Sequence, residues 1–252
     1  MPNDDSAGPV SAVGPVLAFL RLDATNVRRD SLLSVVLTSP VLLALVLRWG
    51  YPAAERWATA VHGFDLAPHR GLLLALLVVV HVAFIFGMLG ALLVLDDADD
   101  RSLLALRVTP VTLAGYLGYR TAAVAVATAL GLVIAVPLAG LVNGPPVEVW
   151  PALALTAACA PLVTLITLVA ASNKVEGMAV IKLLGLPVYL PVLTWVVDAP
   201  WTWALAIIPT YWPVRALQAG LEGRIDAVAL TGGTVYVAAV FVLLRRRYLQ
   251  RW

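Results

Sequence analysis

The sequence predicts an all-α integral membrane protein with six transmembrane helices, and three observations lead to this fold class. Of the 252 residues, 61% are hydrophobic and 13% are charged, against about 45–50% and about 25% in soluble domains. Six apolar stretches are long enough to cross the roughly 30 Å hydrocarbon core of a bilayer. The arginines and lysines concentrate in alternate connecting segments. These features exclude a disordered chain, a coiled coil, a disulfide scaffold and an ordinary soluble enzyme.

The six spans are expected at residues 31–47, 71–95, 113–142, 151–171, 179–197 and 227–244. Each must be helical, because lipid offers no hydrogen-bond partner to the peptide groups of a spanning segment. Several spans contain proline, which predicts local kinks. We expect a single transmembrane domain over 1–252, with a cytosolic tail before residue 31 and a basic cytosolic tail at 245–252.

An amphipathic segment, residues 13–30, precedes the first span. Its apolar residues fall on one helical stripe, whereas its arginines lie mostly off that stripe. Such a helix lies along the inner membrane surface and leads into the first span. The alternative is a cytosolic tail that only happens to be amphipathic.

The second span carries one ionisable residue, His81. A histidine at this depth faces a cavity, relays a proton, or forms a hydrogen-bonded contact between packed helices. The small residues Gly87, Gly90 and Ala91 predict close approach of a neighbouring helix.

An aspartate cluster, Asp96-Asp97-Ala98-Asp99-Asp100, follows the second span. Its DDxxD form is typical of membrane transferases that bind magnesium and a diphosphate. That interpretation predicts a second aspartate-rich motif, but the later aspartates, Asp198 and Asp226, are isolated. The other interpretation is that the acidic residues cap a short helix beginning near Arg101.

Residues 101–110 predict this short amphipathic helix, ended by a proline turn before the third span begins. Arg120 in the third span and Lys182 in the fifth lie near inner ends, where long side chains are expected to reach the headgroups. The pattern leaves open whether Pro187 and Pro191 bend or break the fifth span.

Beyond the fifth span, aromatic residues surround the short apolar run 204–208. The run is too short to cross the membrane and predicts an interfacial or re-entrant hairpin on the outer face. The single cysteine, Cys159, excludes an intramolecular disulfide.

The distribution of positive charge predicts that both termini are cytoplasmic. In this orientation the inner side holds 12 of the 17 arginines and lysines, and the outer side holds 5. The outer five are Arg48, Arg56, Arg70, Arg215 and Arg224. The charges form no patch large enough for nucleic acid, so DNA or RNA binding is not expected.

Three stretches in this order resemble the permease of type-2 ABC exporters, in particular actinobacterial drug-export permeases of the fluoroquinolone-exporter type. The first is the acidic stretch followed by Ser102-Leu103-Leu104-Ala105-Leu106-Arg107-Val108-Thr109-Pro110-Val111. The second is 171–182 and the third is 209–217. In this chain aspartates and Ser102 stand where the family usually has glutamates and a glycine before the first leucine.

The resemblance implies a permease subunit driven by a separate dimer of cytosolic ABC ATPases, to which ATP and magnesium bind. This chain would be no enzyme itself: its two lysines, Lys174 and Lys182, do not follow a glycine as a P-loop lysine does. The implied ATPase contacts are 13–30 and 97–110, with 173–176 nearby. The candidate coupling residues are Asp97, Asp99, Asp100, Arg101, Leu103, Leu104, Leu106, Arg107, Thr109, Pro110, Asn173, Lys174 and Glu176.

The resemblance also implies a second permease chain, identical or homologous, and a site in the cytoplasmic membrane. The expected function is outward movement of an amphipathic drug-like or lipid-like molecule by alternating access. An ion-coupled secondary transporter is the alternative. It predicts acidic residues in the middle of a span, and none is present in the expected spans. The magnesium-dependent transferase is the third hypothesis.

Overall fold

A computed structural model describes residues 31–100 and 111–251, and within these ranges every regular element is a helix. Six of the described helices are long and apolar enough to cross a membrane: Ser34–His62, Ala67–Asp99, Leu113–Leu138, Val149–Ala170, Lys174–Trp195 and Ala227–Leu249. The predicted fold class is confirmed in its six spanning helices. The expected amphipathic helix at 13–30 and the expected short helix at 101–110 lie outside the described residues.

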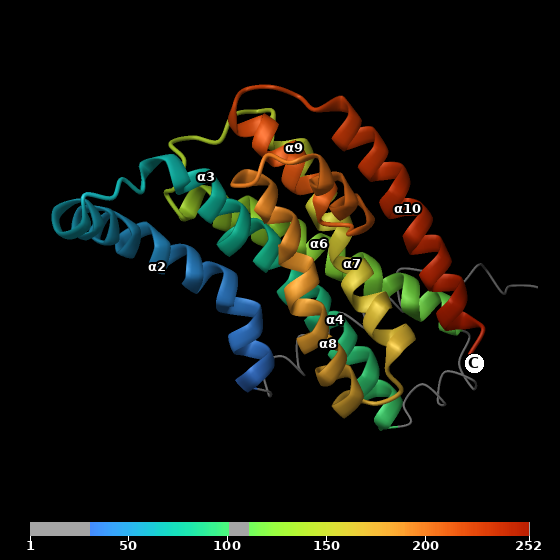
Figure 1. The fold of residues 1–252 in the computed structure, drawn as a ribbon. Helices are drawn as coiled ribbons and strands as arrows, with labels where there is room; N and C mark the ends of the chain where they lie inside the picture. The colour runs from blue at the N-terminus through green and yellow to red at the C-terminus, as the bar shows by residue number, and fades with distance from the viewer. Residues whose placement is uncertain (1–30, 101–110, 252) are drawn as a thin grey trace, which may run out of the picture.

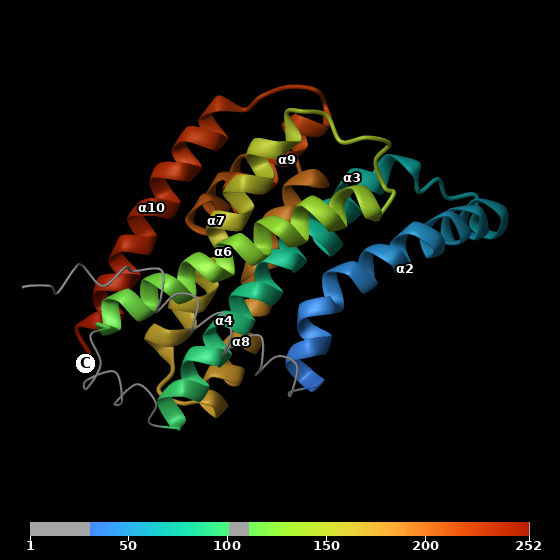
Figure 2. The same ribbon diagram turned by 180° about the vertical axis from the view of Figure 1, so that it is seen from behind.

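Helix α7 (Val149–Ala170) occupies the centre of the bundle and is the most buried span. Helices α4 (His81–Asp99), α6 (Leu113–Leu138) and α10 (Ala227–Leu249) pack around it, and α8 (Lys174–Tyr189) lies against α4 (Figure 1). Helix α2 (Ser31–His62) leans away from the bundle at one side, as Figure 2 shows from behind. The core is therefore built around α7, whereas α2 and α10 are peripheral.

Helix α2 is longer than the predicted first span, because it continues past residue 47 to His62. It contains Pro40 and Pro52, and it bends along its length (Figure 1). Its 32 residues correspond to about 48 Å, which exceeds the hydrocarbon thickness of about 30 Å. A proline inside a helix can kink it without ending it. The helix therefore continues past Pro52, and the polar residues after 47 do not mark its end.

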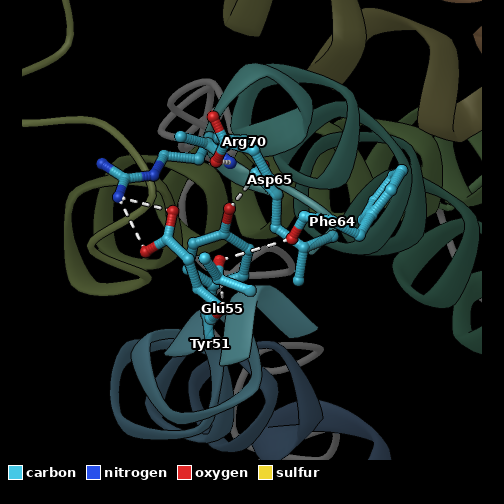
Figure 3. Close-up of polar contacts among 8 residues, drawn as sticks. Tyr51, Glu55, Phe64, Asp65 and Arg70 are labelled. Atoms are coloured by element: carbon cyan, nitrogen blue, oxygen red, sulfur yellow. Dashed lines mark hydrogen bonds and ion pairs between the residues drawn. The ribbon is translucent and has the colours of Figure 1, made fainter. Parts of the chain in front are cut away.

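Polar contacts fasten the far end of α2 to the start of the second span (Figure 3). Both carboxylate oxygens of Glu55 accept hydrogen bonds from Nη2 of Arg70, at 3.0 and 2.9 Å. The Tyr51 hydroxyl donates to the carbonyl of Leu66 at 2.7 Å. Arg70 is therefore paired within the protein rather than extended freely toward headgroups.

The second span is built from four consecutive helical pieces. A 3-10 turn, η1 (Ala67–His69), leads into α3 (Arg70–Leu73), then a π-helix, η2 (Leu74–Val80), and then α4. The close packing predicted at Gly87 and Gly90 is confirmed. A Cβ at Gly87 would lie 2.5 Å from the carbonyl oxygen of Ala160, and one at Gly90 would lie 2.3 Å from a methyl group of Val124.

The fifth span neither breaks nor continues as one α-helix. At Leu190, after Pro187, α8 passes into the 3-10 helix η4 (Leu190–Trp195), which contains Pro191. Beyond it lie η5 (Pro200–Ile207) and α9 (Tyr211–Leu221). Helix α9 is too short to cross the bilayer, at eleven residues or about 17 Å, and Gly223 ends it with φ +71°.

Candidate functional site

The aspartate cluster lies in the last turn of α4, which ends at Asp99, with Asp100 as the C-cap. Asp96, Asp97 and Asp99 therefore belong to α4 itself, and the helix that they were expected to cap lies outside the described residues. Carboxylates at a helix C-terminus face the negative end of the helix dipole and need compensating cations. Those cations come from α6 and α8.

The first cation is Arg120 of α6. Its Nη2 donates to Oδ2 of Asp97 at 2.8 Å, and its Nε donates to the Tyr116 hydroxyl at 3.0 Å. The Tyr116 hydroxyl in turn donates to the same Asp97 oxygen. The Arg120 side chain is 6% exposed. It points into the bundle, so the prediction that it reaches the headgroups is wrong. Three polar groups thus join α4 to α6 inside the bundle.

The second cation is Lys174, the first residue of α8. Its Nζ lies 2.7 and 2.8 Å from the two carboxylate oxygens of Asp96. Its backbone N–H donates to Oδ2 of Asp99 at 3.0 Å. The helix ends are therefore complementary: a cation faces the C-terminus of α4, and a carboxylate faces the N-terminus of α8.

Local sequence explains why α8 begins at this point. The Asn173 side chain accepts the backbone N–H of Glu176 at 2.9 Å, and the Glu176 carboxylate accepts the N–H of Ser172 at 2.8 Å. The Asn173 contact satisfies one of the N–H groups that a helix start leaves unpaired, and the Glu176 contact fixes the residue before the cap. As a result, Lys174 lies next to the last turn of α4.

We call Asp96, Asp97, Asp99, Tyr116, Arg120 and Lys174 the α4–α6–α8 ionic cluster. It brings together Asp97, Asp99 and Lys174 of the predicted coupling residues, with Asn173 and Glu176 directly beside it. Asp100 is exposed, and its carboxylate contacts no described residue. The other predicted coupling residues lie outside the described residues: Arg101, Leu103, Leu104, Leu106, Arg107, Thr109 and Pro110.

Sequence reasoning missed Tyr116 and Arg120 as members of this cluster. Both lie on one face of α6, because their spacing is four residues. That spacing places them on a shared face, but it does not indicate that this face meets Asp97.

The aspartates are divided among different partners rather than gathered around a common centre. Asp96 binds Lys174, Asp97 binds Arg120 and Tyr116, and Asp99 accepts a backbone N–H. Among residues 31–100 and 111–251, no three His, Cys, Asp or Glu side chains lie together in a group that could hold a metal ion. The arrangement is that of an ion-paired junction between helix ends.

His81 makes a polar contact between spans. Its Nδ1 lies 2.8 Å from the Tyr189 hydroxyl of α8, and the ring of Phe84 contacts the same tyrosine. The π-helix η2 ends directly before His81, and π-helical turns are frequent at functional positions. Of the alternatives open for His81, the packed interhelical contact is observed.

At the opposite end of the bundle, η4, η5 and α9 line an open pocket of about 750 Å³ with a largely polar lining. Arg215 lies over the Trp203 ring, 4.6 Å from its centroid. Its Nη1 donates to the Tyr211 hydroxyl at 3.1 Å, and Asp226 lies 3.4 Å from its Nη2. The hydrogen bond with Tyr211 is the main cause that raises the pKa of Arg215 above its ordinary value, so this cation keeps its charge.

Comparison with known proteins adds a family assignment to this geometry. Residues 23–245 match the family described as fluoroquinolones export permease protein Rv2686c-like. The chain is 34% identical over 241 residues to the Fluoroquinolones export permease protein Rv2686c of Mycobacterium tuberculosis strain ATCC 25618 / H37Rv, covering 94% of this chain and 96% of the relative. The protein MT2760 of strain CDC 1551 / Oshkosh, with the same description, shows the same identity and coverage. No solved structure gave a significant match.

Proposed function

Since the chain belongs to the Rv2686c-like family of fluoroquinolones export permeases, we propose that it is the transmembrane subunit of an ATP-driven drug exporter. A separate cytosolic ATPase would supply the energy, and ATP with magnesium would bind there. The substrate would be an amphipathic, drug-like or lipid-like molecule moved outward by alternating access. The ionic-cluster end of the bundle would face the cytosol, as the positive charge of the sequence favours.

The single observation that carries this proposal is the α4–α6–α8 ionic cluster. It flanks both ends of residues 101–110, because Asp97 precedes this segment and Arg120 follows it. Lys174 adds the start of α8 to the same junction. A force applied to 101–110 by a partner would therefore act on three spans together. Without the Asp96–Lys174 contact the force would reach α8 only through apolar packing.

A second permease chain is part of the proposal, and α8 supports it. Val175, Leu183 and Leu186 on this helix are each more than 70% exposed. Lys182 lies on the same exposed surface, about 12 Å along the axis from Lys174, and pairs with no described residue. A lysine here either extends to the headgroups, as its position in the sequence predicts, or meets polar groups of another chain. We propose that this face meets the second chain or the substrate pathway.

The experiment that tests the proposal is purification of the tagged chain from its native membrane in mild detergent, with identification of co-purifying proteins by mass spectrometry. We expect a cytosolic ATPase with a P-loop in stoichiometric amount, and drug-stimulated ATP hydrolysis by the complex. A chain that stays alone in several detergents, with nucleotide present, contradicts the proposal.

Coupling through 101–110 is tested by replacing Leu103, Leu104 and Leu106 together with serine. We expect drug export to fall to background while the chain still inserts, because the apolar contact with the ATPase is lost. The matched control replaces the exposed Val196 and Ile207 at the other end of the bundle with serine, and it should leave export nearly unchanged. Equal export by the triple variant and the control argues against coupling at this segment.

An ion-coupled secondary transporter is the second candidate, and the His81–Tyr189 contact next to η2 is the observation that favours it. Export by this mechanism would stop when a protonophore collapses the proton gradient while cellular ATP is maintained. It would also be lost in His81→Phe. Export that follows ATP instead of the gradient supports the ABC proposal.

A further inference from the structure

A lateral groove of about 900 Å³ runs between α6 and α10, with α7 as its floor. The two walls lie closest near the C-terminus and spread apart away from it (Figure 2). Small side chains keep the groove open, among them Gly118, Ala122, Ala125, Ala154, Ala158 and Ala238. The groove is separate from the ionic cluster and from the exposed face of α8.

The lining of the groove is apolar even where its residues carry hydroxyl groups. Thr121 donates its hydroxyl to the carbonyl of Leu117 at 2.8 Å, and Thr234 donates to that of Leu230 at 2.7 Å. Both bonds stay within the residue's own helix, so these hydroxyls have no free hydrogen for an occupant. The walls therefore suit a hydrocarbon chain.

The groove is longer than one leaflet of a bilayer is thick. On α10 its lining extends from Leu230 to Arg245, which is about 22 Å along a helix. One leaflet contributes about half of the roughly 30 Å hydrocarbon core. An acyl chain lying alongside α10 would thus be covered over its full length.

The end of the groove near the C-terminus is strongly cationic. Arg245 lines it and donates from Nη2 to the carbonyl of Ala114 at 3.2 Å, which leaves most of its five N–H donors available. The last turn of α10 also contains Arg246 and Arg247, and Arg251 lies just beyond the helix. Of these four arginines, none forms an ion pair with a carboxylate of any residue that the structure describes.

We propose that this groove binds an anionic phospholipid, with one acyl chain between α6 and α10 and the phosphate at Arg245. Basic side chains at the end of an apolar intramembrane groove are the chemistry that recognises such a lipid. The lipid would fill the space beside α10, which is the least buried of the six spans, and would fix its position against α6 and α7. This role is independent of the transported substrate.

The test is photocrosslinking of the full chain in phosphatidylcholine vesicles that contain a trace of lipid with a diazirine in its acyl chain. The probe lipid is phosphatidylglycerol in one arm and phosphatidylcholine in the other, and labelled peptides are mapped by mass spectrometry. We expect several-fold more label on α6 and α10 peptides with phosphatidylglycerol. Arg245→Gln should lower that excess about five-fold, whereas Arg56→Gln, an exposed arginine of α2 that does not line the groove, should lower it much less.

A second pair of variants tests the groove itself. Ala238→Leu narrows the groove and should lower the excess label seen with phosphatidylglycerol, whereas Ala239→Leu, on the exposed side of the same helix, should not. Equal labelling by the two probe lipids, equal effects within either pair of variants, or label confined to other helices overturns the proposal. The two arginine variants still test the proposed lipid site if Ala238→Leu fails to fold.

Discussion

Two neighbouring ion pairs in the cluster have the same chemistry and different burial, and burial decides what each contributes. Arg120 opposite Asp97 is 6% exposed, whereas Lys174 opposite Asp96 is 35% exposed. A buried cation that loses its counter-charge keeps its full desolvation penalty. An exposed pair is screened by water and contributes about 0–1 kcal/mol.

Asp97→Asn is therefore expected to destabilise the protein by on the order of 3 kcal/mol, because the buried Arg120 loses the carboxylate that its Nη2 contacts at 2.8 Å. The same substitution at the adjacent Asp96 is the matched control and should change stability by less than about 1 kcal/mol. Thermal unfolding in detergent, followed by tryptophan fluorescence, measures both. Similar melting temperatures for the two variants would contradict the assignment of Asp97 as the counter-charge of a buried arginine.

At the scale of helices, hydropathy predicted the six spans because membrane length and backbone hydrogen bonding restrict the solutions. Helix ends were predicted less well. The acidic residues look like an N-cap when read along the chain, but they form the last turn of α4, where Lys174 compensates them from 78 residues away. The pair of Asp97 with Arg120 likewise depends on how α4 packs against α6, and no local pattern encodes it.

The start of α8 depends on Asn173, and Asn173→Ala should cost about 1 kcal/mol because the N–H of Glu176 loses its acceptor. Asn173→Ser keeps an oxygen at the cap and serves as the conservative control. Hydrogen exchange of the first α8 amides should become faster in the alanine variant and stay close to wild type in the serine variant. Unchanged exchange in the alanine variant would show that Asp99 and the Glu176 contact suffice to hold this helix end.

Close packing of α4 on α7 depends on Gly87, whose carbonyl also accepts the Thr164 hydroxyl at 2.7 Å. Gly87→Ala would place a methyl group 2.5 Å from the Ala160 carbonyl oxygen, so the two helices must separate. We expect a loss of about 1–3 kcal/mol and a lower melting temperature. Gly50→Ala in α2, where a Cβ meets no atom within 4 Å, should be neutral or slightly stabilising. A tolerated Gly87→Ala would mean that α4 and α7 can separate at little cost.

At the scale of the whole molecule, two of the apolar surfaces that the described residues leave exposed, those of α10 and α8, differ in one respect. The outer face of α10 carries exposed apolar residues such as Val228 and Val235 and suits lipid. The exposed face of α8 has Lys182 among its leucines. The proposed second permease chain should therefore meet α8 rather than the outer face of α10.

Disulfide crosslinking distinguishes these two faces. Leu186→Cys on α8 should give a covalent dimer when membranes are oxidised, because the α8 faces of two chains would oppose each other. Val235→Cys on α10 is equally apolar and about as exposed, at 70% against 73%, and should stay monomeric. The native Cys159 is buried at 2% exposure, so it gives little background. A conjugate of a different mass would identify a homologous partner chain that carries its own cysteine at this face, whereas crosslinking through Val235→Cys alone would move the interface to α10 and refute the assignment to α8.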